Sequence, residues 1–353
     1  MRVRWGIIGC GSVCETKSGP AFQRARDSEL VAVMRRDGSL AADFARRHGV
    51  PRWYTNAEAL VRDPEVDAVY VATPPGSHLE HALLACAVGK PAYVEKPMAR
   101  SHAECLCMAE AFVRERQPLF VAYYRRALPR FRVARELIGG GKLGTVTSVA
   151  YSYARPGHNP TNQRPLPWRF RTEHSGGGLL LDVGSHALDL IDYLLGPLSA
   201  VQGSARNLAT NADVEDVAVM SFGLPGGAVG VAEWNFASRA CVDRLEVRGT
   251  SGHLTCSVFG HEPVELATGE ATQRFSFPVP QHIQQPLIES VVDELCGRGH
   301  CPSTAENAAR TSWVMDQVLS EYYGGRQDDF WARRESWPGR RVRSSFGVPG
   351  PPG

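Results

Sequence analysis

The sequence lacks the features that mark membrane, nucleic-acid-binding and repeat proteins. Its 353 residues include no apolar run long enough to span a bilayer, and we expect no secretory signal ahead of the first apolar segment. The formal net charge is only +2, so neither nucleic acid nor an anionic membrane is expected as a partner. No internal repeat is evident. The composition therefore agrees with an ordinary soluble enzyme.

Cysteine motifs are also missing. The chain has nine cysteines, an odd number, and none belongs to a CxxC pair or to a pattern with metal-ligand spacing. We therefore expect free thiols in a reducing compartment, with the cytoplasm as the default location and no bound metal.

The first third of the chain has the pattern of an α/β domain. A chain of this length favours two domains. Up to residue 123, apolar strand-like runs alternate with helical segments, which indicates a doubly wound α/β domain with a parallel sheet, residues 1–123. The predicted strands are 3–8, 30–34, 66–72, 92–94 and 119–123, and the predicted helices are 41–48, 57–61, 78–88 and 103–116.

The pattern changes after residue 123. A helix is predicted over 130–138, and amphipathic helices over 284–296 and 304–323. Between them, two-residue alternation predicts an antiparallel sheet with one covered face. Its expected strands are 146–153, 200–205, 217–222, 228–234, 243–248 and 252–257. We assign 124–340 to a second domain and 341–353 to a tail that is disordered by composition.

A glycine turn follows the first strand. Gly9 and Gly11 allow a tight turn and a close approach to a pyrophosphate at the start of a helix, where Ser12 and Val13 lie. Cys14 replaces the usual third glycine. Pro20 falls where the first helix would continue, so the helix either kinks or begins afresh with Ser18 as its N-cap.

The end of the second strand bears on the choice of dinucleotide. Arg35 and Arg36 stand where an acidic residue would bind the adenosine ribose of NAD. Two guanidinium groups suit the 2′-phosphate of NADP, unless they are simply solvated surface residues. Asp37 follows directly and keeps NAD as the alternative cofactor.

Two further loops fall at the carboxyl ends of predicted strands, where ligands bind in such sheets. Lys96, between a buried strand and Pro97, could donate a proton or hydrogen bond to a substrate oxygen, although a surface lysine in a turn is the plainer interpretation. The candidate cofactor contacts in these loops are Thr73, Pro74, Pro75, His78, Glu95 and Lys96.

A second chemical motif lies between a glycine run at 176–178 and a Gly-Pro stop at 196–197. The pattern predicts one helix, on which Asp182 and His186 project from the same face one turn apart. An imidazole near its ordinary pKa of about 6.5 can accept or return a proton, and a neighbouring carboxylate can orient it. Taken alone, such a pair is more often a solvated surface pair.

The substrate cleft has less specific candidates. Residues 154–172 form a long irregular segment rich in arginine and aromatic residues, and loops of that length are usually functional or disordered. We expect the cleft to be lined by Tyr123, Arg126, Tyr153, His158, Trp168 and Arg169. For Tyr123 and Tyr153, packing in the core is at least as good an interpretation.

Four motifs in this order, at residues 6–11, 72–78, 89–98 and 177–186, closely resemble the glucose–fructose oxidoreductase/inositol dehydrogenase/MocA family. The resemblance spans about residues 3–323 and implies a Rossmann domain followed by an α/β domain with an open, mostly antiparallel sheet. It implies that this second domain, residues 124–340, binds substrate and oligomerises. It further implies that Lys96, Asp182 and His186 are catalytic, that Pro97 is often cis, and that the free sheet face commonly makes a dimer contact. Lys17 stands where many members carry a histidine.

The resemblance and the motifs together predict an NADP-dependent oxidoreductase acting on a sugar, polyol or related cyclic alcohol or ketone, with NAD as the alternative cofactor. Two other functions remain open: a catalytically silent dinucleotide-binding regulator, and a glycosidase that uses bound NAD for transient oxidation. Retention of Lys96, Asp182 and His186 together argues against the silent regulator.

Overall fold

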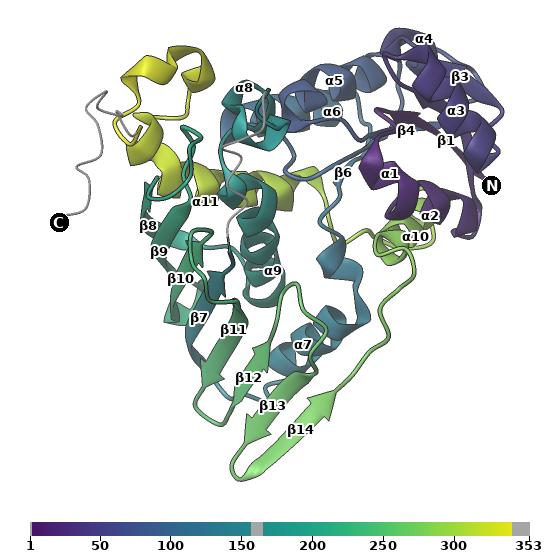
Figure 1. Ribbon diagram of the computed structural model, residues 1–353. Helices are drawn as coiled ribbons and strands as arrows, with labels where there is room; N and C mark the ends of the chain where they lie inside the picture. Colours follow the sequence, from purple (N-terminus) through teal and green to yellow (C-terminus); the bar gives the residue numbers. More distant parts are fainter. Residues whose placement is uncertain (1, 157–164, 341–353) are drawn as a thin grey trace, which may run out of the picture.

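The computed structural model, which describes residues 2–156 and 165–340, begins with a six-stranded parallel sheet (Figure 1). Its strand order is β3-β2-β1-β4-β5-β6, and every pairing is parallel. The strands are β1 Val3–Ile8, β2 Ser28–Met34, β3 Arg52–Tyr54, β4 Ala68–Val71, β5 Ala92–Val94 and β6 Leu119–Val121. The predicted doubly wound domain is confirmed, and the sequence missed only the short edge strand β3.

Both faces of this sheet are buried. Along β4, Ala68 and Tyr70 belong to one apolar cluster and Val69 and Val71 to another, on opposite sides of the sheet. The helices of this domain are α1 Ser12–Thr16, α2 Gly19–Arg24, α3 Gly38–His48, α4 Ala57–Val61, α5 His78–Ala87 and α6 His102–Arg114. Continuous apolar strands of this kind require cover on both faces, which explains why they alternate with helices.

The second sheet has eight strands in the order β14-β13-β12-β11-β7-β10-β9-β8. Only the β10–β7 pairing is parallel, so the predicted mostly antiparallel sheet is confirmed. The strands are β7 Val146–Ala154, β8 Ser199–Arg206, β9 Val217–Gly223, β10 Val229–Asn235, β11 Val242–Gly249, β12 His253–Cys256, β13 Val264–Thr268 and β14 Ala271–Phe275. The sequence missed β13 and β14. The outermost strand, β14, is exposed along most of its length and therefore has no alternating pattern.

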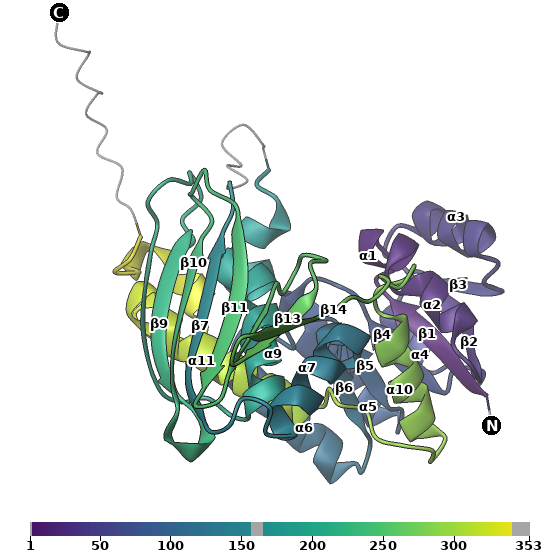
Figure 2. The same ribbon diagram turned by 90° about the horizontal axis from the view of Figure 1, so that it is seen from below.

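Helices cover one face of the eight-stranded sheet (Figure 2). These are α7 Pro129–Gly139, α9 Ser185–Leu195 and α11 Ala305–Tyr323, while the short α8 Thr172–Ser175 lies nearer the first domain. Tyr151, Trp234 and Leu245 point into the core beneath these helices and are buried. The opposite face has no helix over it among the described residues, and Val229 and Val231 remain exposed there.

The two domains share the C-terminal helices. Helix α10, Gln285–Leu295, returns to the Rossmann domain and packs in one of its apolar clusters. Helix α11 contacts α6 of the first domain as well as α9 and β8 of the second. The predicted range 124–340 therefore includes a helix that packs on the first domain, and the predicted tail 341–353 lies outside the described residues. Among those residues, no helix is both long and apolar enough to cross a membrane.

Candidate active site

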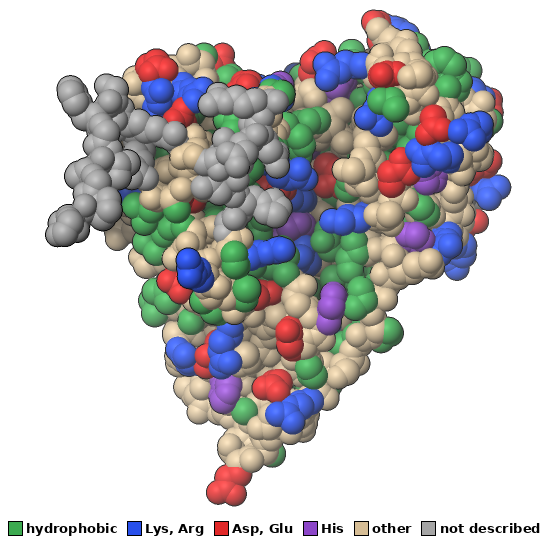
Figure 3. All heavy atoms as spheres, viewed as in Figure 1, with side chains coloured by type: hydrophobic (Ala, Val, Ile, Leu, Met, Phe, Trp, Pro, Cys, Tyr) green, Lys and Arg blue, Asp and Glu red, His purple; other side chains and the backbone are tan. Residues whose placement is uncertain are grey.

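A hollow between the two domains, in which Lys, Arg and His side chains gather, is visible in Figure 3. Loops from the carboxyl ends of the parallel strands reach it from the first domain, and the segment before α9 reaches it from the second. This is the position at which open α/β sheets bind ligands, beside the reversal of strand order at β1.

The glycine turn after β1 has the predicted geometry. Gly9 has φ of +86°, and a Cβ there would lie 2.6 Å from Thr73, so only glycine fits. Gly11 begins α1, and a Cβ built on it would meet nothing nearer than the Gly9 carbonyl oxygen at 3.8 Å. Cys14 is buried in the core below, so the thiol occupies the packing position of the third glycine.

The first helix breaks as one of the two alternatives predicted. Helix α1 ends at Thr16, and α2 begins afresh at Gly19, with Ser18 as N-cap residue and Pro20 in the first turn. A Cβ at Gly19 would clash with the Cys14 carbonyl oxygen at 2.2 Å, so the two helical segments touch closely.

This turn fits a dinucleotide pyrophosphate. The space above Gly11 is open, and the backbone of a helix start faces it. Next to it, the Thr73 hydroxyl is buried and has no hydrogen-bond partner among the described residues. Pro74 and Pro75 continue this loop, where a Cβ at Gly76 would meet the Glu173 carbonyl oxygen of α8 at 2.5 Å.

The two arginines after β2 have no ion pair or hydrogen bond through their side chains within residues 2–156 and 165–340. Arg35 is half-buried and close enough to the glycine turn for its charge to act on the Cys10 thiol, whereas Arg36 is exposed. Asp37 instead caps α3, accepting hydrogen bonds from the Ser39 and Leu40 amides at 3.0 and 3.2 Å. The carboxylate that kept NAD as an alternative therefore has a structural role.

Two predicted cofactor contacts support the loops rather than face the hollow. The His78 ring is fully buried and lies within hydrogen-bond distance of the Thr73, Pro97 and Met98 carbonyl oxygens. Glu95 is buried and accepts hydrogen bonds from Tyr70 and Gln284, both at 2.6 Å. We revise both residues from direct contact to support, because their polar atoms already have partners.

Lys96 contacts the second domain directly. Its Nζ donates to the Asp182 carbonyl oxygen at 2.6 Å and to Asp182 Oδ1 at 2.8 Å. Arg169 Nε donates to Oδ2 of the same carboxylate at 2.8 Å. Burial alone would raise the pKa of Asp182, but Lys96 and Arg169 lower it to about 2. The carboxylate is therefore ionised at neutral pH, and the Lys96–Pro97 bond beside it is cis.

No hydrogen bond joins Asp182 and His186 within residues 2–156 and 165–340. A π-helical turn, Leu180–Gly184, replaces the first part of the expected helix, and α9 begins at Ser185. The Asp182 carboxylate binds Lys96 and Arg169 instead, so its role in orienting the imidazole stays a prediction.

Aromatic rings surround His186 instead. Tyr123, Tyr124 and Phe259 meet its ring edge to face, with centroids 6.1, 5.2 and 6.0 Å away. Its Nδ1 is buried and has no partner among the described residues. Burial, followed by the charges of Arg125, Lys96 and Lys17, lowers the pKa of His186 well below its ordinary value. The imidazole is therefore neutral at pH 7 and able to accept a proton.

The remaining substrate candidates divide into two groups. Trp168 is half-buried and stacks against Arg169 at the hollow. Arg126 is buried in ion pairs with Asp189 and Asp192, and Tyr153 packs on Phe236 and Phe259.

These positions correct two sequence interpretations. Arg126 and Tyr153 are buried in the interior. The guanidinium group of Arg126 and the ring of Tyr153 therefore do not line a cleft. Tyr123 is also fully buried, and its ring contributes to the wall around His186. His158 lies outside the described residues.

Sequence reasoning missed Arg125 and Phe259. Arg125 lies next to the arginine that was selected, and nothing in the sequence separates the two. Phe259 follows β12 in a turn without a motif.

Within residues 2–156 and 165–340, no group of three or more His, Cys, Asp or Glu side chains could hold a metal ion. No disulfide joins the nine cysteines, all of which the structure describes.

Comparisons with known proteins agree with this architecture. Residues 3–123 match the model of an oxidoreductase family with an NAD-binding Rossmann fold, and residues 131–255 match the GFO/IDH/MocA C-terminal domain. "Oxidoreductase P35" of Formosa agariphila is 36% identical over 318 residues, which cover 89% of this chain and 98% of that protein. Levoglucosan dehydrogenase of Pseudarthrobacter phenanthrenivorans is 30% identical over 265 residues, 67% of each chain.

A solved structure shows the same fold. A levoglucosan dehydrogenase in complex with NADH superimposes with a TM-score of 0.80 at 22% identity, covering 91% of this chain and 96% of that one. Both family models match in sequence order and together cover more than half of the chain. The chain therefore belongs to the GFO/IDH/MocA family of NAD-binding oxidoreductases.

Proposed function

We propose that this oxidoreductase is an NADP-dependent dehydrogenase or reductase that acts on a hydroxyl or keto carbon of a sugar, polyol or related cyclic compound. The observation that carries the proposal is the meeting of Lys96 from the first domain with Asp182 and His186 from the second, beside a glycine turn that fits a pyrophosphate. The relatives named as dehydrogenases of sugar-like compounds support this substrate class.

Each residue has a role that follows from its surroundings. In the oxidative direction, neutral His186 would accept the hydroxyl proton at Nε2, because Nδ1 is enclosed. Lys96 would stabilise the developing alkoxide by charge and hydrogen bonding. Asp182 would hold the Lys96 ammonium group through its carboxylate and its carbonyl oxygen. When bound, the nicotinamide would supply the hydride acceptor or donor.

The preference for NADP rests on Arg35 and Arg36. Both guanidinium groups lack a protein partner in the described residues, and the neighbouring carboxylate of Asp37 caps α3. Unpaired guanidinium groups at this place suit a phosphate, which accepts several charge-assisted hydrogen bonds. The matching family model is described as NAD-binding, and the solved levoglucosan dehydrogenase is in complex with NADH. Calorimetric Kd values for NAD and NADP test the preference.

The first experiment measures absorbance of the reduced nicotinamide with a panel of sugars, polyols and cyclic alcohols, using NAD and NADP in parallel. Net reduction of NADP with one or more substrates is the expected result. A glycosidase with transient oxidation would release product without net cofactor turnover. A silent regulator would bind cofactor, raising the melting temperature, and turn over none of the panel.

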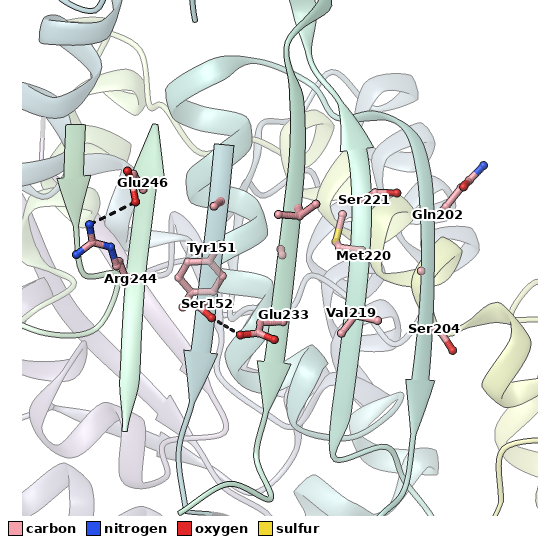
Figure 4. A pocket seen from close by; sticks show the side chains of 14 residues that line it. Tyr151, Ser152, Gln202, Ser204, Val219, Met220, Ser221, Glu233, Arg244 and Glu246 are labelled. Atoms are coloured by element: carbon pink, nitrogen blue, oxygen red, sulfur yellow. Dashed lines mark hydrogen bonds and ion pairs between the residues drawn. The ribbon is translucent and has the colours of Figure 1, made fainter. Parts of the chain in front are cut away.

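We also propose that two copies associate through the bare face of the eight-stranded sheet. Val219, Val229 and Val231 are 46, 61 and 56% exposed there. Val219 and Val231 lie among Glu233, Arg244 and Glu246 around a hollow of about 630 Å³ (Figure 4). An exposed sheet face with central valines and charges of both signs is suited to a second copy of itself.

The absence of disulfides among the cysteines supports a reducing compartment, the cytoplasm, for this enzyme.

A further inference from the structure

Three arginines in the described residues are more than nine-tenths buried: Arg125, Arg126 and Arg326. Two of them are neutralised by carboxylates. Arg126 pairs with Asp189 and Asp192, and Arg326 with Asp316. Arg125 has no ion pair within residues 2–156 and 165–340, although it is only 5% exposed.

Arg125 has one hydrogen bond where its buried neighbours have several. Its Nε donates to the Val258 carbonyl oxygen at 2.9 Å, and Nη1 is buried without a partner. Within the described chain, Nη2 also makes no hydrogen bond. A buried cation without a counter-ion is costly, because desolvation is not repaid by ionic contact. The arrangement therefore indicates that a partner of opposite charge is missing.

The protein does not provide that partner from the adjacent turn. Two acids lie near Arg125. Asp189, on which the Arg125 charge acts, is already paired with Arg126. The two oxygens of Asp243 accept hydrogen bonds from the Val258, Phe259 and Gly260 amides. The carboxylate thus stabilises the turn that follows β12. Neither carboxylate is therefore a direct ionic partner of Arg125 in the described residues.

The position of Arg125 relates it to the substrate rather than to the cofactor. Its guanidinium stacks over Tyr124 at 4.9 Å and over Phe259 at 4.3 Å. The same two rings face His186, at 5.2 and 6.0 Å. The unpaired cation is therefore next to the proposed proton acceptor in the second domain, whereas the cofactor phosphates belong at the glycine turn and Arg35 in the first.

Other cations surround the same place. Lys96 and Arg169 share the single carboxylate of Asp182, which leaves positive charge in excess. Lys17, exposed at the end of α1, lies close enough for its charge to act on His186. The Lys and Arg side chains that gather in the hollow in Figure 3 are consistent with this excess. A neutral sugar would leave it unbalanced.

We infer that the substrate is an anionic sugar derivative, a sugar acid or a sugar phosphate, whose anionic group is bound by Arg125 and attracted by Lys17. This inference rests on the proposed dehydrogenase function and specifies the substrate class of the same site. Arg125 is a planar donor suited to a carboxylate or phosphate, and Lys17 occupies the position that sequence reasoning left without a role.

The test uses substrate pairs that differ only in the anionic group: glucuronate and glucose 6-phosphate against glucose, galacturonate against galactose, and gluconate against sorbitol. A charge-assisted hydrogen bond in a water-poor site corresponds to about ten- to a hundredfold in affinity. We expect kcat/KM to be at least about tenfold higher for one anionic member of a pair than for its neutral counterpart. The acid and phosphate arms decide which anion is recognised.

Variants identify the residue responsible. Arg125→Met should lose the preference for the anionic substrate, and Arg125→Lys should retain part of it. Arg132→Met, on the exposed side of α7, is the matched control and should keep the full preference. Because Arg125→Met breaks no ion pair, we expect it to fold, and its circular dichroism and cofactor Kd check this.

A second measurement does not depend on turnover. Sugar acids or sugar phosphates should raise the melting temperature of the wild-type protein in the presence of cofactor, and should raise that of Arg125→Met much less. High salt should reduce the shift.

Two results would overturn the inference. One is a neutral sugar used as well as its anionic counterpart; the other is an anion preference that survives in Arg125→Met. If no compound is turned over with either cofactor, the proposed function fails, and the thermal shifts with anionic ligands still decide whether Arg125 binds an anion.

Discussion

The two sheets of this protein differ in how many of their faces are covered, and the difference separates their tasks. The parallel sheet is buried on both faces, so it meets ligands only at its ends, through the turn at Gly9 and the loop that presents Lys96. The eight-stranded sheet has helices on one face and exposed valines on the other. Its covered face provides His186, and its bare face is free for a partner.

The comparison also explains where the site lies. The proposed site draws on both domains, since Lys96 comes from the first and Asp182 and His186 from the second. Helix α11, which contacts both domains, helps to hold them together. Because the site is divided between the two domains, substitutions in each half should change different measurable properties of the enzyme.

The largest effect is expected from the second domain, at His186. Replacement of a positioned proton acceptor costs about 10²- to 10⁴-fold in rate, so His186→Ala should lower kcat by that factor while the Kd for cofactor is retained. Steady-state kinetics beside calorimetric titration of cofactor test this. If His186→Ala keeps most of the wild-type turnover, His186 is not the proton acceptor.

The pH dependence of the wild-type enzyme follows from the environment of the same ring. Burial and the cations nearby lower the pKa of His186, so the accepting neutral form persists below the ordinary value of about 6.5. The structure therefore replaces the expectation of a near-neutral pKa. Oxidative kcat/KM should stay constant from about pH 6.5 to 9 and decline only at lower pH. A rise centred near pH 7 would show that the ring is more solvated than the structure has it.

The junction of the domains depends on Arg126. Arg126→Met would leave Asp189 buried without its ion pair, whereas Asp192 would retain Arg310. Breaking a buried pair in this way costs about 3–5 kcal/mol in the free energy of unfolding. Urea titration measures this loss. Arg132→Met, at an exposed position on α7, should change the free energy of unfolding by less than about 0.5 kcal/mol. Equal stabilities of the two variants would refute the structural role of Arg126.

The first domain contributes its chemistry through Lys96. Lys96→Met should lower turnover about a hundredfold or more and leave folding and cofactor affinity nearly unchanged, because the glycine turn and Arg35 lie elsewhere. Kinetics with matched cofactor titrations separate the two effects. If the variant lost cofactor binding and turnover in parallel, Lys96 would be a cofactor contact rather than a catalytic group.

Cofactor choice is expected to depend on the first domain alone. Arg35→Asp should weaken NADP by at least about ten- to a hundredfold, the value of one charge-assisted hydrogen bond, and leave NAD similar or improved. NADP binding should weaken with salt more than NAD binding does. Arg132→Asp controls for the change in net charge. Wild-type protein that binds NAD as tightly as NADP would exclude the NADP assignment.

The smallest effect on stability is expected on the bare sheet. Val231→Lys should dissociate the proposed dimer while changing the unfolding free energy of the monomer by less than about 0.5 kcal/mol, because this side chain is already exposed. Sedimentation over a range of concentrations measures the association. Val113→Lys on α6, at a valine 77% exposed away from this face, is the control. A monomeric wild-type protein would refute the dimer.

The boundaries that the sequence predicted best belong to elements with a strong local signal. Helix α4 and strand β5 begin and end where expected, since an apolar run or a helical period defines them within a few residues. Strand β14 was missed because an edge strand with both faces exposed needs no alternation. The π-helical turn at Leu180 was missed because it alters the path of the backbone without altering the residue pattern from which a helix is predicted.

The sequence by itself determined the two-domain α/β architecture, the glycine turn and the identity of Lys96, Asp182 and His186 as a family motif. These follow from periodicity and from motifs that are local in the chain. Only the tertiary structure decided that Asp182 binds Lys96 and not His186, and that Arg126 is neutralised while Arg125 is not. The physical reason is that a polar atom's availability depends on which distant groups satisfy it, and residues adjacent in sequence can face entirely different partners.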